Sequence, residues 1–120
     1  MSTLQIPLVE CPIWVATQPV DFRSSIDGLC AVVVNLLKAE PTRGLYIFYN
    51  RQRDKIKALL WHKNGFMLIY KRLEKGHFNF QFSENKTTMT LTSREFNWLL
   101  AGLDWQRMSQ WKELDFGTFS

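Results

Sequence analysis

The sequence predicts an α+β fold: a single domain, residues 1–120, in which a mostly antiparallel sheet of five or six strands packs on one long helix, with a second helix towards the C-terminus. Short runs rich in β-branched and aromatic residues recur along the chain, as is typical of strands. Apolar residues at helical spacing between residues 22 and 39 predict the long helix. A chain of 120 residues that is 46% hydrophobic has the size and composition of a globular domain rather than of a disordered segment.

The N-terminal part of the chain predicts one strand and the long helix. Ile13–Ala16 is a short apolar run, and Pro12 before it places this strand at a sheet edge or marks its start. The helix is expected over residues 22–39, with Asp21 as its N-terminal cap and Pro41 just beyond its end.

Two positions early in this helix carry further expectations. Glycine costs about 1 kcal/mol relative to alanine in a helix interior, so we expect another backbone to approach Gly28 where the helix crosses the sheet. Arg23 and Asp27 are four residues apart, a spacing that allows an ion pair on the helix surface. The alternative is that Arg23 contacts a partner molecule.

The centre of the chain predicts three consecutive antiparallel strands, Leu45–Tyr49, Ile56–Trp61 and Phe66–Tyr70. Asn64-Gly65 tolerates the positive φ angles of a type I′ hairpin turn, so we expect it to join the second strand to the third. Such a turn sets the register and places four pairs opposite each other: Lys63 and Phe66, Trp61 and Leu68, Leu59 and Tyr70, and Lys57 and Arg72. The other face of this hairpin is more apolar and is expected to lie on the core, with Ile56, Ala58, Leu60 and His62 beside Met67, Ile69 and Lys71.

The C-terminal part predicts two further strands and the second helix. Three phenylalanines alternate with polar residues over residues 77–82, which predicts a strand, and residues 86–91 are expected to return as another. Thr92 and Glu95 have the spacing of a capping box. We therefore expect a helix that opens at residue 93 and ends near Gly102.

Positive charge is concentrated in the central stretch. Between Arg43 and Lys75 the chain holds nine Lys and Arg against two Asp and Glu, a balance of +7, whereas the rest holds six against nine, a balance of −3. Together these give the +4 of the whole chain. This asymmetry predicts a polyanionic partner, with nucleic acid as the first candidate. The opposition of Lys57 and Arg72 fits either a phosphate-binding face or a hairpin end splayed into solvent, since opposed like charges destabilise a sheet.

The central stretch resembles the core of the TnpB accessory proteins of the insertion sequence 66 family, also called second-open-reading-frame proteins. The family pattern joins an aromatic strand, an Asn- and Arg-rich connection, a basic strand with Trp, a glycine turn, and a Tyr-Lys-Arg-Leu-Glu-Lys-Gly segment. The residues that match are Phe48, Asn50, Arg51, Arg53, Asp54, Lys55, Ile56, Lys57, Leu60, Trp61, Gly65, Tyr70, Lys71, Arg72, Leu73, Glu74 and Gly76. Flanking matches are Asp21, Arg23, Gly28, Leu29, Leu91, Thr92, Phe96, Leu99, Leu100, Gly102, Leu103, Asp104 and Trp105.

The resemblance implies a bacterial accessory factor of DNA transposition that acts beside a separate, larger transposase and has no catalytic activity of its own. The basic stretch then predicts binding of transposon DNA, mainly at the phosphate backbone. The expected nucleic-acid-binding residues are Arg51, Arg53, Lys55, Lys57, Lys63, Lys71, Arg72 and Lys75. Trp61, Tyr70 and Arg23 are expected to add an aromatic and partner-facing surface.

The alternative function is a protein-interaction module. The same aromatic and basic surface would dock an acidic part of the transposase and assemble the transposition complex without contacting DNA, since Arg, Trp and Tyr are common interface anchors. The tail, residues 106–120, either packs on the domain or offers a docking surface to another chain.

The sequence carries no recognisable catalytic or metal-binding motif. A nucleotidyl-transfer site needs about three carboxylates around divalent metal ions, and the central stretch holds only Asp54 and Glu74. Cys11 and Cys30 have no Cys or His ligand within a turn, so we expect buried free thiols and neither metal nor cofactor. No apolar run reaches the roughly 20 residues of a membrane span, and the N-terminus lacks a leader pattern. We therefore expect a cytoplasmic protein with neither a membrane nor a small-molecule partner.

Overall fold

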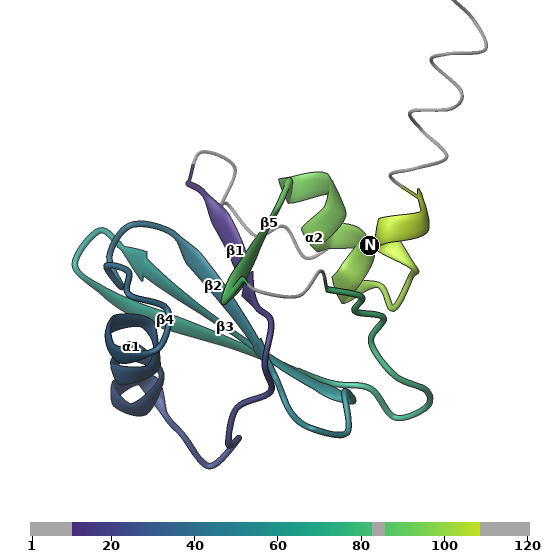
Figure 1. Cartoon of the computed structure of the whole chain (residues 1–120), viewed down its shortest axis with the longest axis horizontal. Helices are drawn as coiled ribbons and strands as arrows, with labels where there is room; N and C mark the ends of the chain where they lie inside the picture. Colours follow the sequence, from purple (N-terminus) through teal and green to yellow (C-terminus); the bar gives the residue numbers. More distant parts are fainter. Residues whose placement is uncertain (1–10, 83–85, 109–120) are drawn as a thin grey trace, which may run out of the picture.

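A computed structural model describes residues 11–82 and 86–108 of the chain (Figure 1). The strands are β1 (Ile13–Ala16), β2 (Leu45–Tyr49), β3 (Lys55–His62), β4 (Gly65–Arg72) and β5 (Thr88–Leu91). The helices are α1 (Ile26–Asn35) and α2 (Ser93–Leu100), and residues 105–108 are again helical. Within the described ranges no helix is both long and apolar enough to cross a membrane.

The five strands form one sheet in the order β4-β3-β2-β1-β5. The consecutive strands β2, β3 and β4 pair antiparallel, as predicted. β1 runs parallel to β2 and antiparallel to β5, so α1 lies in the crossover that parallel neighbours require. The predicted α+β class and the strand number are confirmed, and the single parallel pair makes the sheet mixed.

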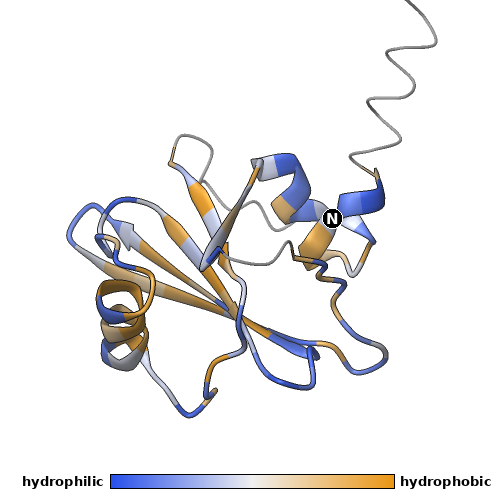
Figure 2. Ribbon diagram, in the orientation of Figure 1, coloured by the Kyte–Doolittle hydropathy of each residue, from blue (hydrophilic) through white to orange (hydrophobic). Residues whose placement is uncertain are grey.

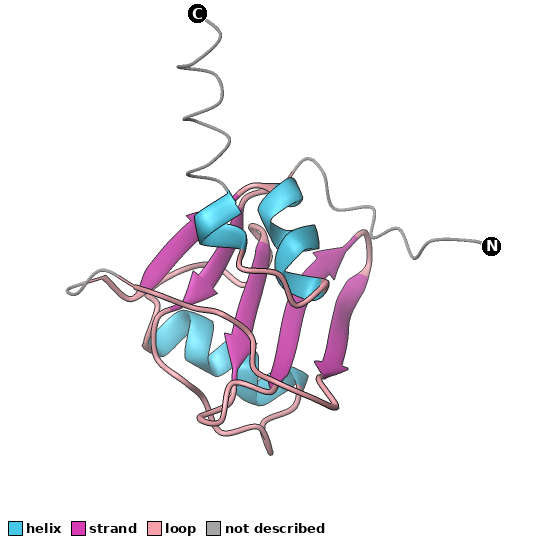
Figure 3. Cartoon of the chain, turned by 90° about the vertical axis from the view of Figure 1, so that its right-hand side faces the viewer, coloured by secondary structure: helices cyan, strands magenta, loops and turns pink. Residues whose placement is uncertain are grey.

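Helices cover both faces of the sheet (Figures 1 and 3). Side chains alternate between the faces, and because both are buried, all five residues of β2 are apolar and buried. Figure 2 shows the hydrophobic colour running through the central strands. One buried set lies with α1 and comprises Ala16, Leu29, Val33, Tyr46, Phe48 and Leu59. The other lies with α2 and includes Ile47, Tyr49, Ile56, Ala58, Leu60, Phe78, Phe80, Phe96, Leu99 and Trp105. The face of the β3–β4 hairpin that was expected to lie on the core does so, on the α2 side. The centre of the opposite face is also buried, against α1.

α1 is shorter than predicted at both ends. The carboxylate of Asp21 accepts hydrogen bonds from the main chain and the guanidinium of Arg23 instead of capping the helix. Ser25 is the N-cap residue and makes no side-chain capping bond. At the other end, Lys38 has a left-handed backbone with φ of 54°, so the chain leaves the helix well before Pro41.

Two expectations for the start of α1 are wrong. Arg23 pairs with Asp21 rather than with Asp27, because both Asp21 and Arg23 lie in the non-helical lead. A Cβ on Gly28 would lie 3.0 Å from the side chain of Ser24, and no backbone from another element lies within contact distance. The close approach at Gly28 is therefore local to the first turn of the helix.

The β3–β4 turn lies one residue earlier than predicted. Lys63 and Asn64 form the turn, and only Lys63 has a positive φ, of 57°, so the turn is not type I′. The observed pairs are His62 and Gly65, Trp61 and Phe66, Lys57 and Tyr70, and Lys55 and Arg72. The predicted opposition of Lys57 and Arg72 is wrong. Each partner differs by two residues, an even shift that leaves every side chain on its predicted face.

Residues 77–82 are not a strand, contrary to the prediction. No strand ladder among the described residues holds this main chain. One main-chain bond runs from the Phe78 N–H to the Arg53 carbonyl, and side chains make the other bonds, from Arg53 to the Phe80 carbonyl (3.1 Å), from Trp105 to the Asn79 carbonyl (2.9 Å) and from Gln106 to the Gln81 carbonyl (2.5 Å). The alternation of phenylalanines still has a structural cause. Phe80 and Phe82 stack on each other and on Tyr49.

α2 lies where the sequence placed it. The hydroxyl of Thr92 accepts from the N–H of Glu95, and the Glu95 carboxylate accepts from the N–H of Thr92, which completes the predicted capping box. Gly102 has φ of 77°. The N–H groups of Gly102 and Leu103 donate to the carbonyls of Leu99 and Trp98, a Schellman motif that ends the helix. Of the tail, only residues 106–108 are described, and the expectation for residues 109–120 lies outside the described residues.

Candidate nucleic-acid interface

The connection between β2 and β3 is built around the buried side chain of Asn50, which is 5% exposed. Its Oδ1 accepts hydrogen bonds from the N–H groups of Asp54 (3.1 Å) and Lys55 (3.0 Å), and its Nδ2 donates to the Asp54 carboxylate at 2.6 Å. The bond from Asn50 lowers the pKa of the Asp54 carboxyl. Because these bonds fix both ends of the turn, Arg51 and Gln52 are held exposed at its tip.

An open cleft of about 460 Å³ lies between this turn and the chain that leads into α1. Its charged lining consists of three basic side chains, Arg23, Arg51 and Lys55, and one acidic side chain, Asp21. The side chains of Arg51 and Lys55 make no hydrogen bond or ion pair with any residue in the described part of the chain. No local pattern in the sequence groups Arg23 with the other two, and the fold brings all three together.

Asp21 and Arg23 form an exposed, two-pronged ion pair within the cleft. The guanidinium contacts both carboxylate oxygens, with a shortest distance of 2.7 Å. The bond from Arg23 lowers the pKa of Asp21 from 3.8 to about 2, so this carboxylate is charged at neutral pH. An exposed pair of this kind contributes little to stability, but it offsets one of the three positive charges of the cleft.

Arg72 and Lys75 extend the positive surface beyond the cleft. Arg72 lies opposite Lys55 in the β3–β4 ladder and pairs with Glu74 at 2.8 Å. The chain after β4 then runs back along the β2–β3 turn, with main-chain bonds of 2.7 Å from Leu73 to Asp54 and from Phe78 to Arg53. Lys75 lies exposed between these two anchors. Five residues at this end of the sheet form what we call the basic end: Arg23, Arg51, Lys55, Arg72 and Lys75.

Two lysines of the predicted set are bonded inside the protein. Lys57 is 7% exposed, and its ammonium donates to the carbonyls of Phe22 (2.8 Å) and Ser24 (2.7 Å). The same ammonium lies 5.0 Å from the Phe22 ring and 5.6 Å from the Tyr70 ring. Lys71 donates to the carbonyl of Leu100 at the C-terminus of α2, where the helix dipole favours a cation. The ammonium groups of Lys57 and Lys71 are bonded to main-chain carbonyls of the protein, so we do not include these two lysines in the interface.

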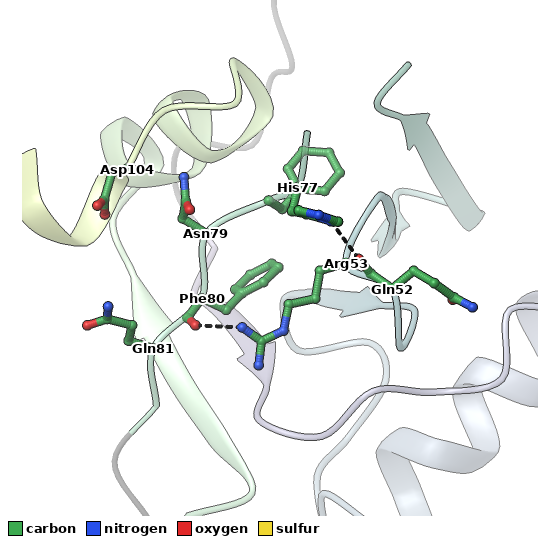
Figure 4. Close-up of a pocket in the computed structure, with 8 residues that line it drawn as sticks. Gln52, Arg53, His77, Asn79, Phe80, Gln81 and Asp104 are labelled. Atoms are coloured by element: carbon green, nitrogen blue, oxygen red, sulfur yellow. Dashed lines mark hydrogen bonds between the residues drawn. The ribbon is translucent and has the colours of Figure 1, made fainter. Parts of the chain in front are cut away.

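Arg53 also makes bonds within the protein (Figure 4). Its guanidinium donates to the Phe80 carbonyl and lies 6.0 Å from the Tyr49 ring. His77 Nδ1 lies 2.9 Å from the Gln52 carbonyl beside it. A polar hollow of about 440 Å³ separates these residues from Asp104. Arg53 has a left-handed backbone, with φ of 61°. Its side chain and its carbonyl both bond to residues 77–82 and so hold the turn against that segment.

Lys63 and Trp61 lie away from the basic end, whereas Tyr70 lies next to it, on the same face of β4 as Arg72. Lys63 is exposed in the β3–β4 turn, beside Trp61, whose ring packs edge-on against Phe66 with centroids 5.0 Å apart. Tyr70 lies opposite Lys57, four residues along β3 from Trp61, a spacing of about 13 Å. Trp61 and Tyr70 therefore lie at two separate places on the hairpin, and only Tyr70 borders the basic end.

Sequence reasoning missed the parts of the site that depend on tertiary contacts. Asn50 organises the turn, and its only signal was its place in the family pattern. Asp21 was expected to cap a helix, although it supplies the one carboxylate of the cleft. Lys57 had a readable signal, because it lies inside a strand between apolar residues on a face that also carries Leu59.

The described residues hold no group of three His, Cys, Asp or Glu side chains placed to bind a metal ion. Cys11 and Cys30 are both half-buried thiols. Burial raises the pKa of the Cys30 thiol, so Cys30 is protonated at neutral pH and has the character of a packing residue.

Comparisons of the sequence with known proteins place the chain in a family. A family model described as IS66 Orf2 like protein matches residues 11–110. The uncharacterized protein y4jC of Sinorhizobium fredii (strain NBRC 101917 / NGR234) is 38% identical over 99 residues, which cover 82% of this chain and 84% of the relative. The uncharacterized protein y4hO of the same organism is 28% identical over 107 residues, covering 88% and 92%. No solved structure gives a significant match.

Proposed function

Because the chain belongs to the IS66 Orf2-like family, we propose that it is a non-catalytic accessory protein of transposition that binds transposon DNA through its basic end. Membership in the family implies the accessory role in transposition. The proposal of DNA contact rests on one observation, the cleft that is lined by Arg51 and Lys55 from the β2–β3 connection and by Arg23 from the chain before α1.

The chemistry of the cleft suits phosphate. The side chains of Arg51 and Lys55 make no hydrogen bond or ion pair with the described residues, so binding a phosphate costs them no existing bond. Each Lys or Arg that neutralises a DNA phosphate releases counterions, which makes affinity fall as salt rises. Contacts to phosphate position a protein on DNA without reading its sequence. We therefore expect similar affinities for a duplex that carries an end of the element and for a scrambled duplex.

Docking of the separate transposase is the second candidate function, and one contact favours it. Arg23 already binds a carboxylate, that of Asp21, through both oxygens. An acidic segment of the transposase would find the same geometry in the cleft. In this alternative the basic end assembles the transposition complex through carboxylates, and the protein does not touch DNA.

The test is binding of the purified chain to a labelled duplex across a salt titration, read by fluorescence anisotropy. Arg51→Gln is expected to weaken binding and to reduce the slope of log affinity against log salt by about 1, the effect of losing one phosphate contact. Asp21→Asn is expected to strengthen binding, because it leaves Arg23 free. The pKa of about 2 means that only substitution removes this carboxylate charge under assay conditions.

Two substitutions outside the cleft serve as controls. Arg94→Gln removes a positive charge at the start of α2, and Glu40→Gln removes a negative charge before β2, both from exposed positions. Each is expected to change affinity much less than its counterpart in the cleft. Equal effects of Arg51→Gln and Arg94→Gln would show only a general charge effect and would contradict the site. Absence of DNA binding at low salt would leave the docking function, to be tested by pull-down of the transposase with the same variants.

A further inference from the structure

β4 is a long edge strand: it pairs with β3 on one side, and no strand of the described part of the chain pairs with its other side. It is the first strand in the sheet order and spans eight residues, whereas β5 at the other edge spans four. Proteins commonly blunt an edge by shortness, proline or charge. β4 contains no proline, and its first six residues, Gly65 to Tyr70, carry no charge. The shortness that protects the β5 edge is therefore missing at β4.

The ladder bonds fix which main-chain groups of β4 point away from the sheet. The N–H of Leu73 donates to the carbonyl of Asp54 on the β3 side. Because main-chain groups alternate in direction along a strand, the odd-numbered residues of β4 face β3. The N–H and C=O groups that point to the open edge belong to the even-numbered residues Phe66, Leu68, Tyr70 and Arg72.

Apolar side chains gather beside this edge. Six large hydrophobic side chains are exposed among the described residues, and three of them lie on the β3–β4 hairpin: Trp61 (37%), Met67 (41%) and Tyr70 (52%). Tyr70 and Met67 point to opposite faces, since they lie three residues apart in one strand. A strand added to β4 would thus be flanked by apolar contacts on both faces.

We propose that β4 pairs antiparallel with β4 of a second copy of this chain, forming a symmetric dimer with one continuous ten-stranded sheet. The charge pattern of β4 is compatible with self-pairing in the antiparallel direction. The basic residues of β4, Lys71 and Arg72, lie at one end of the strand, and Gly65 and Phe66 lie at the other. Antiparallel pairing places each basic end opposite an uncharged end, whereas parallel pairing would oppose like charges. A two-fold axis brings the same open groups of both copies together.

The first measurement is the mass of the full chain in solution across a concentration series, by sedimentation equilibrium and without DNA. We expect a reversible dimer of two 14.2 kDa chains. Leu68→Pro removes one donor at the open edge of each copy and leaves the β3–β4 ladder intact, because the Leu68 N–H points outward. It is expected to weaken dimerisation at least about tenfold. Leu68→Val keeps the donor and is the matched control, with dimerisation close to that of the parent chain.

Amide hydrogen exchange gives a second readout that needs no substitution. The amides of Leu68 and Tyr70 are expected to exchange fast at low concentration and to become protected as the dimer forms, while those of Met67 and Ile69 are protected throughout. A chain that stays monomeric, or a dimer in which Leu68 and Tyr70 still exchange fast, would overturn the proposal. Arg51→Gln is expected to leave the dimer unchanged, so failure of DNA binding and failure of dimerisation are separate outcomes.

Discussion

Lys55 and Lys57 lie two residues apart on the same face of β3, yet their surroundings differ. Lys55 lines the open cleft, and its side chain makes no hydrogen bond or ion pair with the described residues. Lys57 is buried, with its ammonium bonded to two main-chain carbonyls and stacked near two rings. The difference arises because residues 22–24 pass over Lys57 and leave Lys55 at the rim. Lys57 therefore has a structural role, whereas Lys55 is available for binding.

Substituting both lysines by methionine is expected to separate binding from stability. Lys57→Met leaves the carbonyls of Phe22 and Ser24 without their donor and should lower the free energy of unfolding by about 1–3 kcal/mol. Lys55→Met should change stability by no more than about 0.5 kcal/mol and weaken DNA binding several-fold. Urea denaturation and anisotropy measure the two effects. If Lys57→Met unfolds with an unchanged free energy, the bonds from Lys57 to the carbonyls of Phe22 and Ser24 do not contribute to stability.

At the scale of elements, Gly44, the residue before β2, lies directly against the start of β1. The N–H of Leu45 donates to the carbonyl of Pro12 at 2.9 Å, which begins the parallel pair. A Cβ on Gly44 would overlap that carbonyl oxygen and lie 2.8 Å from a ring carbon of Trp14. Only glycine fits between the two strands here, so the residue before β2 sets the contact between β1 and β2.

Alanine at two glycines tests this contact. Gly44→Ala is expected to lower the free energy of unfolding by about 1–3 kcal/mol, because backbone and a large ring must move to admit the methyl group. Gly65→Ala is the control, since a Cβ at Gly65 would have no heavy atom within 4 Å and the φ of Gly65 is not positive. The comparison requires thermal or urea unfolding of both variants. Similar stability of the two would contradict the close approach at Gly44.

At the scale of the whole molecule, Trp105 joins three parts of the fold. It is 2% exposed, packs in the same buried set as α2 and the sheet, and donates its indole N–H to the carbonyl of Asn79. Residues 77–82 have no strand partner among the described residues, so this ring and the bond it makes help to hold them on the sheet. The face opposite α1 therefore depends on a residue beyond the end of α2.

Removing this ring is expected to threaten the fold as a whole. Trp105→Ala should cost about 3–5 kcal/mol, the usual range for a buried tryptophan, out of a total stability of about 5–15 kcal/mol. Trp61→Ala, at a side chain that is 37% exposed, should cost less than half as much. Circular dichroism during urea unfolding gives both values. A Trp105→Ala chain as stable as Trp61→Ala would show that the described packing does not support residues 77–82.

Local patterns predicted the elements whose signals are local. The capping box of α2, the strands of the central meander and the α+β class needed only neighbouring residues. The parallel pair of β1 and β2 was not predictable, because it joins segments far apart in the sequence through packing. The alternation of phenylalanines at residues 77–82 predicted a strand, and the structure has none there. An alternating pattern indicates which side chains are buried, but it does not indicate whether the main chain is hydrogen-bonded to a neighbouring strand. In the candidate site, Arg51 and Lys55 were among the predicted residues. The internal bonds of Lys57 and Lys71 could not be predicted, because they are made to segments that are distant in the sequence.

β1 lies between β2 and β5, so the first of the five strands to leave the ribosome shares ladders with the second and with the last. Once residues up to Arg72 have emerged, the nascent chain can complete the meander from contacts between sequence neighbours. β1 then has a partner on one side only, and its other side stays open until Thr88–Leu91 have been synthesised. During translation, residues 13–16 therefore keep an open ladder edge after the meander has formed, and such an unpaired edge is exposed to aggregation until β5 covers it.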